Sequence, residues 1–207
     1  MKLPNSEWKT YKQLMSLRLY LSRKQISEEA IDLIMQKGIC MCLNKGTPLI
    51  RERDVEHYLY YIEKGCCRFF TTRERDAEEI TFQFAFEGEF VNSLLSFKTG
   101  QPSAFTIETL APCEIWAFHK KHWENLIEKA SGIKQLFQEI LEELFIAKLQ
   151  REMQMLKYSP EELYLLLINT NPMIFREVPL KYIAAYLGIT PQSLCRLRNR
   201  IARKKRS

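Results

Sequence analysis

Length, composition and charge set the first limits on this protein. Its 207 residues are 46% hydrophobic, which is enough to bury a core and long for one small domain. Eight Lys or Arg and no acidic residue follow Glu177. These residues contribute +8 to the net charge of +6, so the residues up to Glu177 sum to about −2, +6 minus +8. No apolar run approaches the ~20 residues of a membrane-spanning helix and the start lacks a secretion signal, so we expect a cytoplasmic protein.

The first elements in chain order are a helical segment and then many short strands. Residues 6–36 are predicted to be helical, with Ser27 as a cap within this segment. From about residue 39 to 119, short apolar runs are separated by turn residues, and the predicted strands are 39–43, 47–52, 56–62, 66–72, 80–86, 105–110 and 113–119. This regular spacing is typical of a barrel or β-roll.

Alternation within residues 80–86 predicts which side chains of that strand are buried. The hydrophobic residues at every second position are expected on one buried face: Ile80, Phe82, Phe84 and Phe86. Thr81 and Gln83 are expected to point away from it.

Residues 131–157 predict one long helix, because they contain no proline and no glycine beyond Gly132. One apolar stripe has the spacing of a helix that packs lengthwise on a similar helix: Ile133, Phe137, Ile140, Leu144 and Ala147. A second stripe lies beside it: Leu141, Phe145, Leu149, Met153 and Leu156. We expect one stripe to face the roll and the other a second subunit, and we assign the dimer contact to Ile133, Phe137, Ile140 and Leu144. The alternative is a helix buried wholly within its own chain.

A new domain is predicted to begin near Ser159. Serine caps helices, Pro160 suits the first helical position, and the carboxylates of Glu161 and Glu162 favour the positive end of a helix. The stretch that follows, 178–197, has the spacing of a helix-turn-helix: Ala184 precedes Gly188 by four residues and Leu194 follows it by six. Such a motif needs a small residue where its helices cross, a turn residue that tolerates positive φ, and an inward apolar anchor.

The second helix of this motif is predicted to read DNA. Thr190 is its expected N-cap and Pro191 its first residue. Gln pairs with adenine and Arg with guanine, while Ser, Thr and a helix N-terminus suit phosphate. The DNA-binding candidates are therefore Thr190, Gln192, Ser193, Arg196, Arg198, Arg200 and Lys181. Of the basic residues, Arg198, Arg200 and those at 203–206 are expected to follow the DNA backbone or remain solvated.

The order of β-roll, long helix and C-terminal helix-turn-helix resembles the Crp/Fnr family of bacterial transcription regulators over nearly the whole chain. Its most specific parts are Gly88-Glu89-Phe90 and the terminal Leu-Gly-Ile-Thr-Pro-Gln-Ser-Leu-Cys-Arg. The resemblance implies an α+β fold: a cyclic-nucleotide-binding-type roll (1–130), a dimerisation helix (131–157) and a winged-helix-like DNA-binding domain (158–207). It also implies a homodimer on an inverted repeat of double-stranded DNA, with RNA polymerase as a partner and no membrane contact.

The resemblance places an effector pocket at Glu89, Phe90 and Ser103. Family members that bind cyclic AMP carry an Arg-Ser pair after the Gly-Glu segment, and the arginine neutralises the cyclic phosphate. Here the corresponding residues are Pro102-Ser103-Ala104, so a buried phosphate would lack its ionic partner. Lys98 in the same loop is the substitute cation to consider, and Glu89 has the alternative reading of a turn carboxylate. We expect no cofactor, and an effector other than cyclic AMP or none.

Other classes of protein find less support in the sequence. We expect no enzyme, since there is no Gly-rich phosphate loop or nucleophile elbow, and His119-Lys120-Lys121-His122 lacks the acidic partner of a hydrolytic zinc motif. The six cysteines show no paired zinc spacing and are expected to be reduced thiols, with no metal site. Two alternatives stay open: a constitutive DNA-binding regulator with a purely structural roll, and a polybasic module that binds RNA or a membrane surface.

Overall fold

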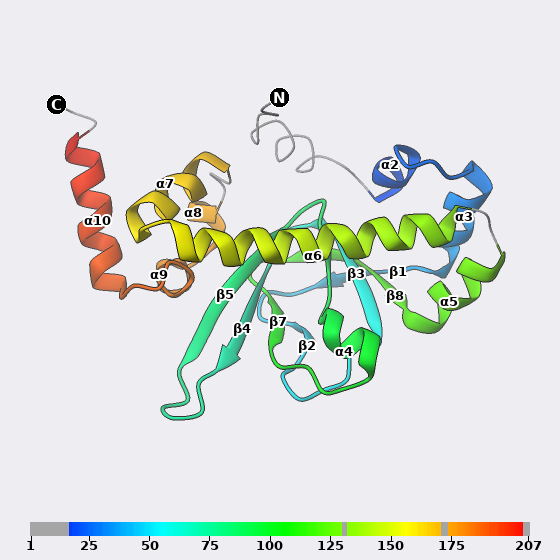
Figure 1. Cartoon of the computed structure of the whole chain (residues 1–207), viewed down its shortest axis with the longest axis horizontal. Coiled ribbons are helices and arrows are strands. Elements are labelled where there is room, and N and C mark those ends of the chain that lie inside the picture. Colours follow the sequence, from blue (N-terminus) through cyan, green and yellow to red (C-terminus); the bar gives the residue numbers. More distant parts are fainter. Residues whose placement is uncertain (1–16, 130–131, 171–173, 205–207) are drawn as a thin grey trace.

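The computed structural model describes residues 17–129, 132–170 and 174–204 (Figure 1). Helices α2 (Leu17–Ser22) and α3 (Glu28–Lys37) precede the strands. Ser27 caps α3 as predicted, because its side chain accepts a hydrogen bond from the backbone N–H of Ala30 at 3.2 Å. Residues 6–16 of the predicted helical segment lie outside the described residues.

Eight strands form the predicted roll as two antiparallel four-stranded sheets. The first sheet has the order β1 (Ile39–Leu43), β8 (Cys113–His119), β3 (Tyr58–Lys64), β6 (Phe90–Val91). The second has the order β2 (Pro48–Ile50), β7 (Thr106–Thr109), β4 (Cys66–Thr72), β5 (Glu79–Phe86). Strand β6 and the short helix α4 (Leu94–Thr99) were not predicted, since two residues are too few to show alternation.

Strand β5 does not have the single buried face that its sequence predicts. Phe69 of β4 pairs with Gln83, but Phe70 pairs with Thr81, so Phe82 is an extra residue in a β-bulge. Phe82 packs in the roll interior, whereas Phe84 packs on the outer face against the C-terminal helices. Thr81, expected to point away from the core, is fully buried. A bulge shifts the pleat by one residue, which is why strict alternation failed here.

Helix α5 (Lys120–Lys129) leads to the long helix α6 (Ile133–Lys157), which crosses the roll (Figure 1). The long helix is confirmed, but the assignment of its stripes needs correction. Ile133 and Ile140 are 0% exposed and Phe137 is 9% exposed, all within a core formed with α2, α3 and the roll, and Leu144 packs against that core. These four residues are therefore already in contact with their own chain.

The C-terminal part consists of α7 (Pro160–Thr170), α8 (Ile174–Glu177), α9 (Leu180–Tyr186) and α10 (Pro191–Lys204). Ser159 and Glu162 form a capping box that starts α7: the Ser159 N–H and hydroxyl both donate to the Glu162 carboxylate, at 2.8 and 2.7 Å. This contact lowers the pKa of Glu162. The described residues after Tyr158 are all helices and turns, so the strands of a wing are not found there.

The hydrophobic core of the C-terminal helices includes residues of the roll. Cys66, Phe84 and Leu110 belong to the same buried cluster as the residues of α7, α9 and α10. The helix-turn-helix is therefore docked on the second sheet instead of being held by its linker alone. No helix among the described residues has the length and apolar character needed to cross a membrane.

Candidate functional site

The spacing of the predicted helix-turn-helix is realised in α9 and α10. Ala184 and Leu194 are fully buried where the two helices meet. Gly188 has a φ of +70°, a backbone conformation that side chains with a Cβ rarely adopt, and it makes the turn between the helices. The small residue, the turn residue and the apolar anchor thus each occupy the position that the motif requires.

The N-terminus of α10 is ordered by a short chain of hydrogen bonds. The Thr190 hydroxyl caps the helix by accepting from the backbone N–H of Ser193 at 3.2 Å, and donates to the Ser193 hydroxyl at 3.0 Å. Arg196 donates from Nη2 to the same Ser193 hydroxyl at 3.3 Å. Gln192 and Arg196 are exposed, while Leu194 and Leu197 on the opposite face are buried. The polar face of α10 therefore presents Gln and Arg side chains to solvent.

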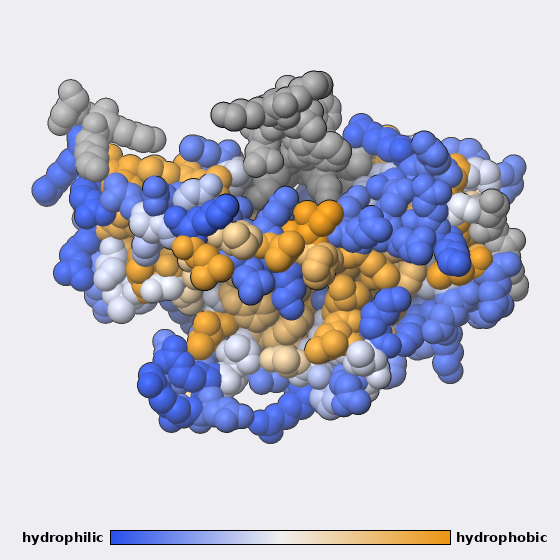
Figure 2. Space-filling view, in the orientation of Figure 1, coloured by the Kyte–Doolittle hydropathy of each residue, from blue (hydrophilic) through white to orange (hydrophobic). Residues whose placement is uncertain are grey.

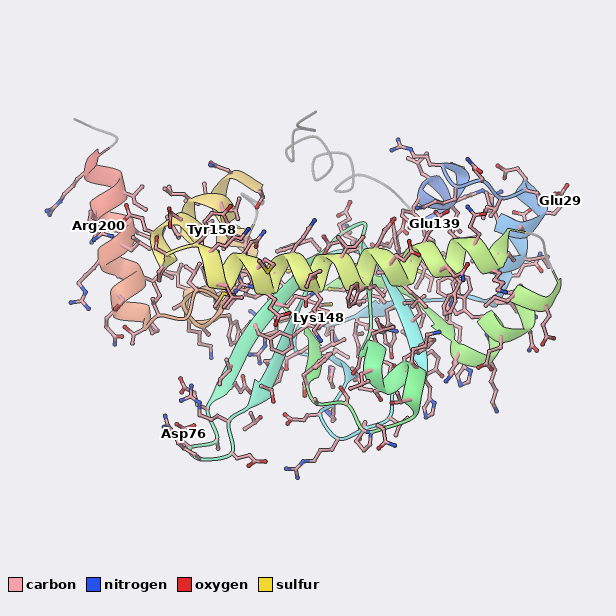
Figure 3. All side chains as sticks on the ribbon, viewed as in Figure 1. Glu29, Asp76, Glu139, Lys148, Tyr158 and Arg200 are labelled. Atoms are coloured by element: carbon pink, nitrogen blue, oxygen red, sulfur yellow. The ribbon has the colours of Figure 1, made fainter. Side chains whose placement is uncertain are left out.

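The remaining basic candidates lie around this face. Arg198 is exposed, and Arg200 projects from α10 (Figure 3) and forms a salt bridge with Glu161 of α7. The Lys181 ammonium lies 4.8 Å from the centre of the Tyr182 ring at the start of α9. Residues 205 and 206 of the basic end lie outside the described residues.

The effector-pocket residues predicted from the resemblance do not come together. The backbone N–H of Phe86 donates to the Glu89 carboxylate at 3.2 Å, so Glu89 is a carboxylate of its own turn. Phe90 packs edge-on against Tyr20 and Tyr61, at ring-centre distances of 5.4 and 4.9 Å, in the core below α2. Of the three residues, Ser103 alone belongs to a buried polar cluster.

That cluster contains residues which the sequence analysis missed. The Ser103 hydroxyl donates to the Ser93 hydroxyl at 2.8 Å or to the Phe105 carbonyl at 2.7 Å. Glu56, which is 2% exposed, accepts from the N–H groups of Tyr58 and Ser93 at 3.0 and 3.4 Å. No motif spacing marks these residues, because they come from three separate loops that only the fold brings together.

Burial of Glu56 gives this cluster an unusual carboxyl group. Loss of water around the charged form raises the pKa of Glu56 to about 7, although the backbone N–H donors act in the opposite direction. Arg51 and Arg53 belong to the loop that holds Glu56, and Lys98 is the one cation in the segment 94–105. Pro102 has neither a charge nor an N–H, and the Lys98 ammonium lies 5.2 Å from the centre of the Phe137 ring.

The second apolar stripe of α6 is exposed beyond its first residue, Leu141, which packs against the core. Phe145, Leu149 and Leu156 are 61%, 46% and 77% exposed, and Met153 is also exposed. Hydrophobic residues gather along the middle of the molecule in Figure 2, where α6 crosses the view. The exposed part of this stripe, which lies beside the one assigned to the dimer from the sequence, is therefore available to meet another surface.

Comparison with known proteins identifies the domain type of the roll. Residues 41–130 match the family model of the cyclic nucleotide-binding domain. Among curated proteins, no sequence matches the chain. The roll is thus a domain of the cyclic nucleotide-binding type, and the helices α7 to α10 follow it after α6.

Solved structures extend this likeness to the whole arrangement. The chain is 16% identical to a crystal structure of a putative Crp/Fnr transcriptional regulator from Eubacterium rectale, with a TM-score of 0.64 over 86% of this chain and 85% of that one. FixK2 from Bradyrhizobium japonicum is 14% identical, with a TM-score of 0.64 over 81% and 86%. CLP of Xanthomonas campestris, described as a c-di-GMP responsive global regulator, is 14% identical, with a TM-score of 0.61 over 86% and 93%. The chain has the fold of the Crp/Fnr family of transcription regulators, which confirms the fold expected from the sequence.

Proposed function

We propose that this chain is a sequence-specific, DNA-binding transcription regulator. The observation that carries the proposal is α10: its inner face is anchored by Leu194 and Leu197, and its outer face presents Gln192 and Arg196 beside a capped N-terminus. A helix held in this way matches the width of the DNA major groove, where Gln and Arg distinguish base pairs. RNA polymerase is the partner that a regulator of this class implies.

The proposed protein is a homodimer that pairs through the second stripe of α6. The stripe Phe145, Leu149, Met153 and Leu156 is exposed over several helical turns, and a symmetric partner would cover it with the same residues. Parallel packing of the two α6 helices is required, because it places both α10 helices at the same end of the dimer (Figure 1). An antiparallel pair would put them at opposite ends and prevent binding to one inverted repeat.

The proposed regulator is not controlled by cyclic AMP. The Ser103 hydroxyl is already bonded within the polar cluster, and the nearby buried carboxyl of Glu56 would repel a phosphate once ionised. Asn92, next to Ser93, is buried, and neither atom of its side-chain amide has a hydrogen-bond partner among the described residues. One free acceptor and one free donor suit a neutral polar effector better than an anion. A constitutive regulator with a structural roll remains the alternative.

Selection of duplexes from a random pool tests the proposal directly. We expect the purified protein to enrich an inverted repeat whose half-site centres lie about 34–36 Å apart, one turn of DNA. Single-stranded RNA and anionic lipid vesicles serve as competitors. Equal affinity for all duplexes, or preferential binding to RNA or vesicles, would show that the basic end acts as a general polyanion binder.

A further inference from the structure

We propose that Arg68 and Arg151 dock the helix-turn-helix on the roll and so position α10 for DNA. Arg68 lies on β4 and Arg151 on α6, and both guanidinium groups stack on tyrosines of α9. This inference rests on the proposed function, since it concerns how the reading helix is held. Neither arginine belongs to the polar cluster or to the DNA-binding face.

Arg68 offers α9 a flat charged surface. Its guanidinium is held edge-on by two carboxylates, Glu79 at 2.8 Å and Glu108 at 3.1 Å, which come from the strands on either side of β4. The two faces of the group are thereby left for aromatic rings. The guanidinium carbon lies 3.8 Å from the centre of the Phe70 ring and 4.0 Å from the centre of the Tyr182 ring.

Arg151 joins three elements at one point. It lies eleven residues after Ile140, 151 minus 140, which is about three helical turns and places it on the side of α6 that faces the roll. Its Nε donates to the Phe82 carbonyl of β5 at 3.4 Å, and its Nη2 donates to the Tyr186 carbonyl at the C-terminal end of α9. The guanidinium carbon lies 3.5 Å from the centre of the Tyr186 ring.

The bulge in β5 makes this contact possible. Phe82 is the extra residue there, so its carbonyl is not required to pair with β4 and accepts from Arg151 instead. The same bulge leaves Phe84 on the outer face, where its ring lies 5.1 Å from the ring of Tyr186. The carbonyl of Tyr186 ends α9, and a cation at a helix C-terminus satisfies such a group favourably.

Docking of α9 fixes α10, because the two helices share a buried core at Ala184 and Leu194. Tyr182 and Tyr186 are one helical turn apart on α9, so the two arginines hold the helix at two points and oppose rotation about either one. Nη1 of Arg68 and Nη1 of Arg151 are buried and have no hydrogen-bond partner among the described residues.

Arg151→Met tests the proposal while keeping a long apolar stem. Lys148→Met is the matched control, since Lys148 is an exposed cation on the same helix (Figure 3). In the free protein, we expect Arg151→Met to increase amide hydrogen exchange in α9 at least tenfold, with the roll strands β1, β3 and β8 unchanged. We also expect Arg151→Met to bind the selected inverted repeat roughly tenfold more weakly and to bind random duplex within twofold of wild type. The variant should still bind repeats whose half-sites are moved apart by one or two base pairs.

A second pair of variants guards against a general loss of stability. Tyr186→Phe keeps the ring and should behave as wild type, whereas Tyr186→Leu should reproduce the effects of Arg151→Met. Unchanged exchange in α9 would overturn the docking role. Faster exchange with unchanged or tighter binding to the repeat would overturn the positioning role. If wild type itself prefers no duplex, the proposed function fails and takes the positioning role with it, while the exchange measurement still decides whether Arg151 docks α9.

Discussion

At the residue scale, Arg196 is the side chain on which the proposed function depends most directly. Its bond to Ser193, which in turn is bonded to Thr190, holds the guanidinium beside the N-terminus of α10. The guanidinium retains further N–H donors, which is what a bidentate contact with guanine needs. The Thr190 cap fixes the start of α10, and the same chain of hydrogen bonds orients the Arg196 guanidinium.

Replacement of Arg196 should therefore change specificity as well as affinity. We expect Arg196→Ala to lose about 1–3 kcal/mol of binding free energy at one base pair of each half-site and to relax the preference there. Replacing Lys204 and Lys205 together should weaken binding to all sequences alike and reduce its salt dependence. Titrations on the selected repeat, on single-base variants of it and on random duplex measure both effects. Equal losses on specific and random DNA would mean that Arg196 contacts only phosphate.

Glu56 makes a second prediction at the residue scale, concerning stability and pH. The raised pKa means that the folded protein holds this proton more tightly than the unfolded chain does. The contribution of Glu56 to stability is therefore fully present below about pH 4.5 and is lost as the pH rises through about 7, by roughly 3 kcal/mol at most.

Glu56→Gln removes this titration while keeping an oxygen that accepts from the N–H of Tyr58. Denaturant unfolding from pH 5 to pH 8 gives the free energy of unfolding of both proteins. We expect wild type to lose stability relative to the variant across this range, since all other groups titrate in both. A constant difference would show that the folded carboxyl has an ordinary pKa.

At the element scale, α6 is a helix with two different apolar faces. One face completes the core of its own chain through Ile133 and Ile140, and the other is exposed through Phe145 and Leu149. Both stripes have helical spacing, so periodicity predicts two buried faces without telling which surface covers each. Beyond Ile140, the roll-facing side continues to Arg151, which binds β5 and α9.

Charged substitutions on α6 should separate assembly from folding. We expect Leu149→Glu to yield a folded monomer that binds the inverted repeat poorly, because a carboxylate would be buried in the proposed dimer contact. Gln150→Glu is the control, since it adds the same charge at a neighbouring exposed position. Ile140→Glu should instead unfold the chain. Sedimentation and circular dichroism distinguish these outcomes, and a wild-type monomer at micromolar concentration would refute the proposed dimer.

At the scale of the whole molecule, the roll is linked to the C-terminal helices by more than the chain connection. A single buried cluster runs from Cys66, Phe84 and Leu110 of the roll into α7, α9 and α10. The polar cluster around Glu56 and Ser103 lies within the same roll. Any ligand that moves β4 or β5 would therefore act on α9 without passing through the Tyr158–Ser159 connection.

Cyclic AMP is not expected to be such a ligand. Titration calorimetry should show no binding below about 100 μM, a free energy weaker than roughly −5.5 kcal/mol, because Pro102 offers the phosphate neither a charge nor an N–H donor. Micromolar binding would overturn this prediction. If Lys98→Ala then abolished the binding of cyclic AMP, Lys98 would be the substitute cation. If Glu89→Ala abolished that binding, Glu89 would have to leave its turn to reach the ligand.

The sequence by itself determined the features that depend on near neighbours in the chain. Turn residues and short apolar runs predict the strands of the roll, and the capping box at Ser159 predicts the start of α7. The spacing of Ala184, Gly188 and Leu194 predicts the helix-turn-helix, because helix crossing and turn geometry require those residue types within about ten positions. These expectations are local, and the structure agrees with them.

Which surfaces meet depends on the packing of the whole folded chain. The bulge at Phe82 depends on the partner strand β4, so the split of the phenylalanines between two cores has no signature in β5 alone. The gathering of Glu56 with Ser93 and Ser103, and the stacking of Arg68 and Arg151 on α9, join residues far apart in the chain. Such contacts are selected by the packing of whole sheets and helices, and a linear pattern of hydrophobic and polar residues does not encode which partner lies opposite.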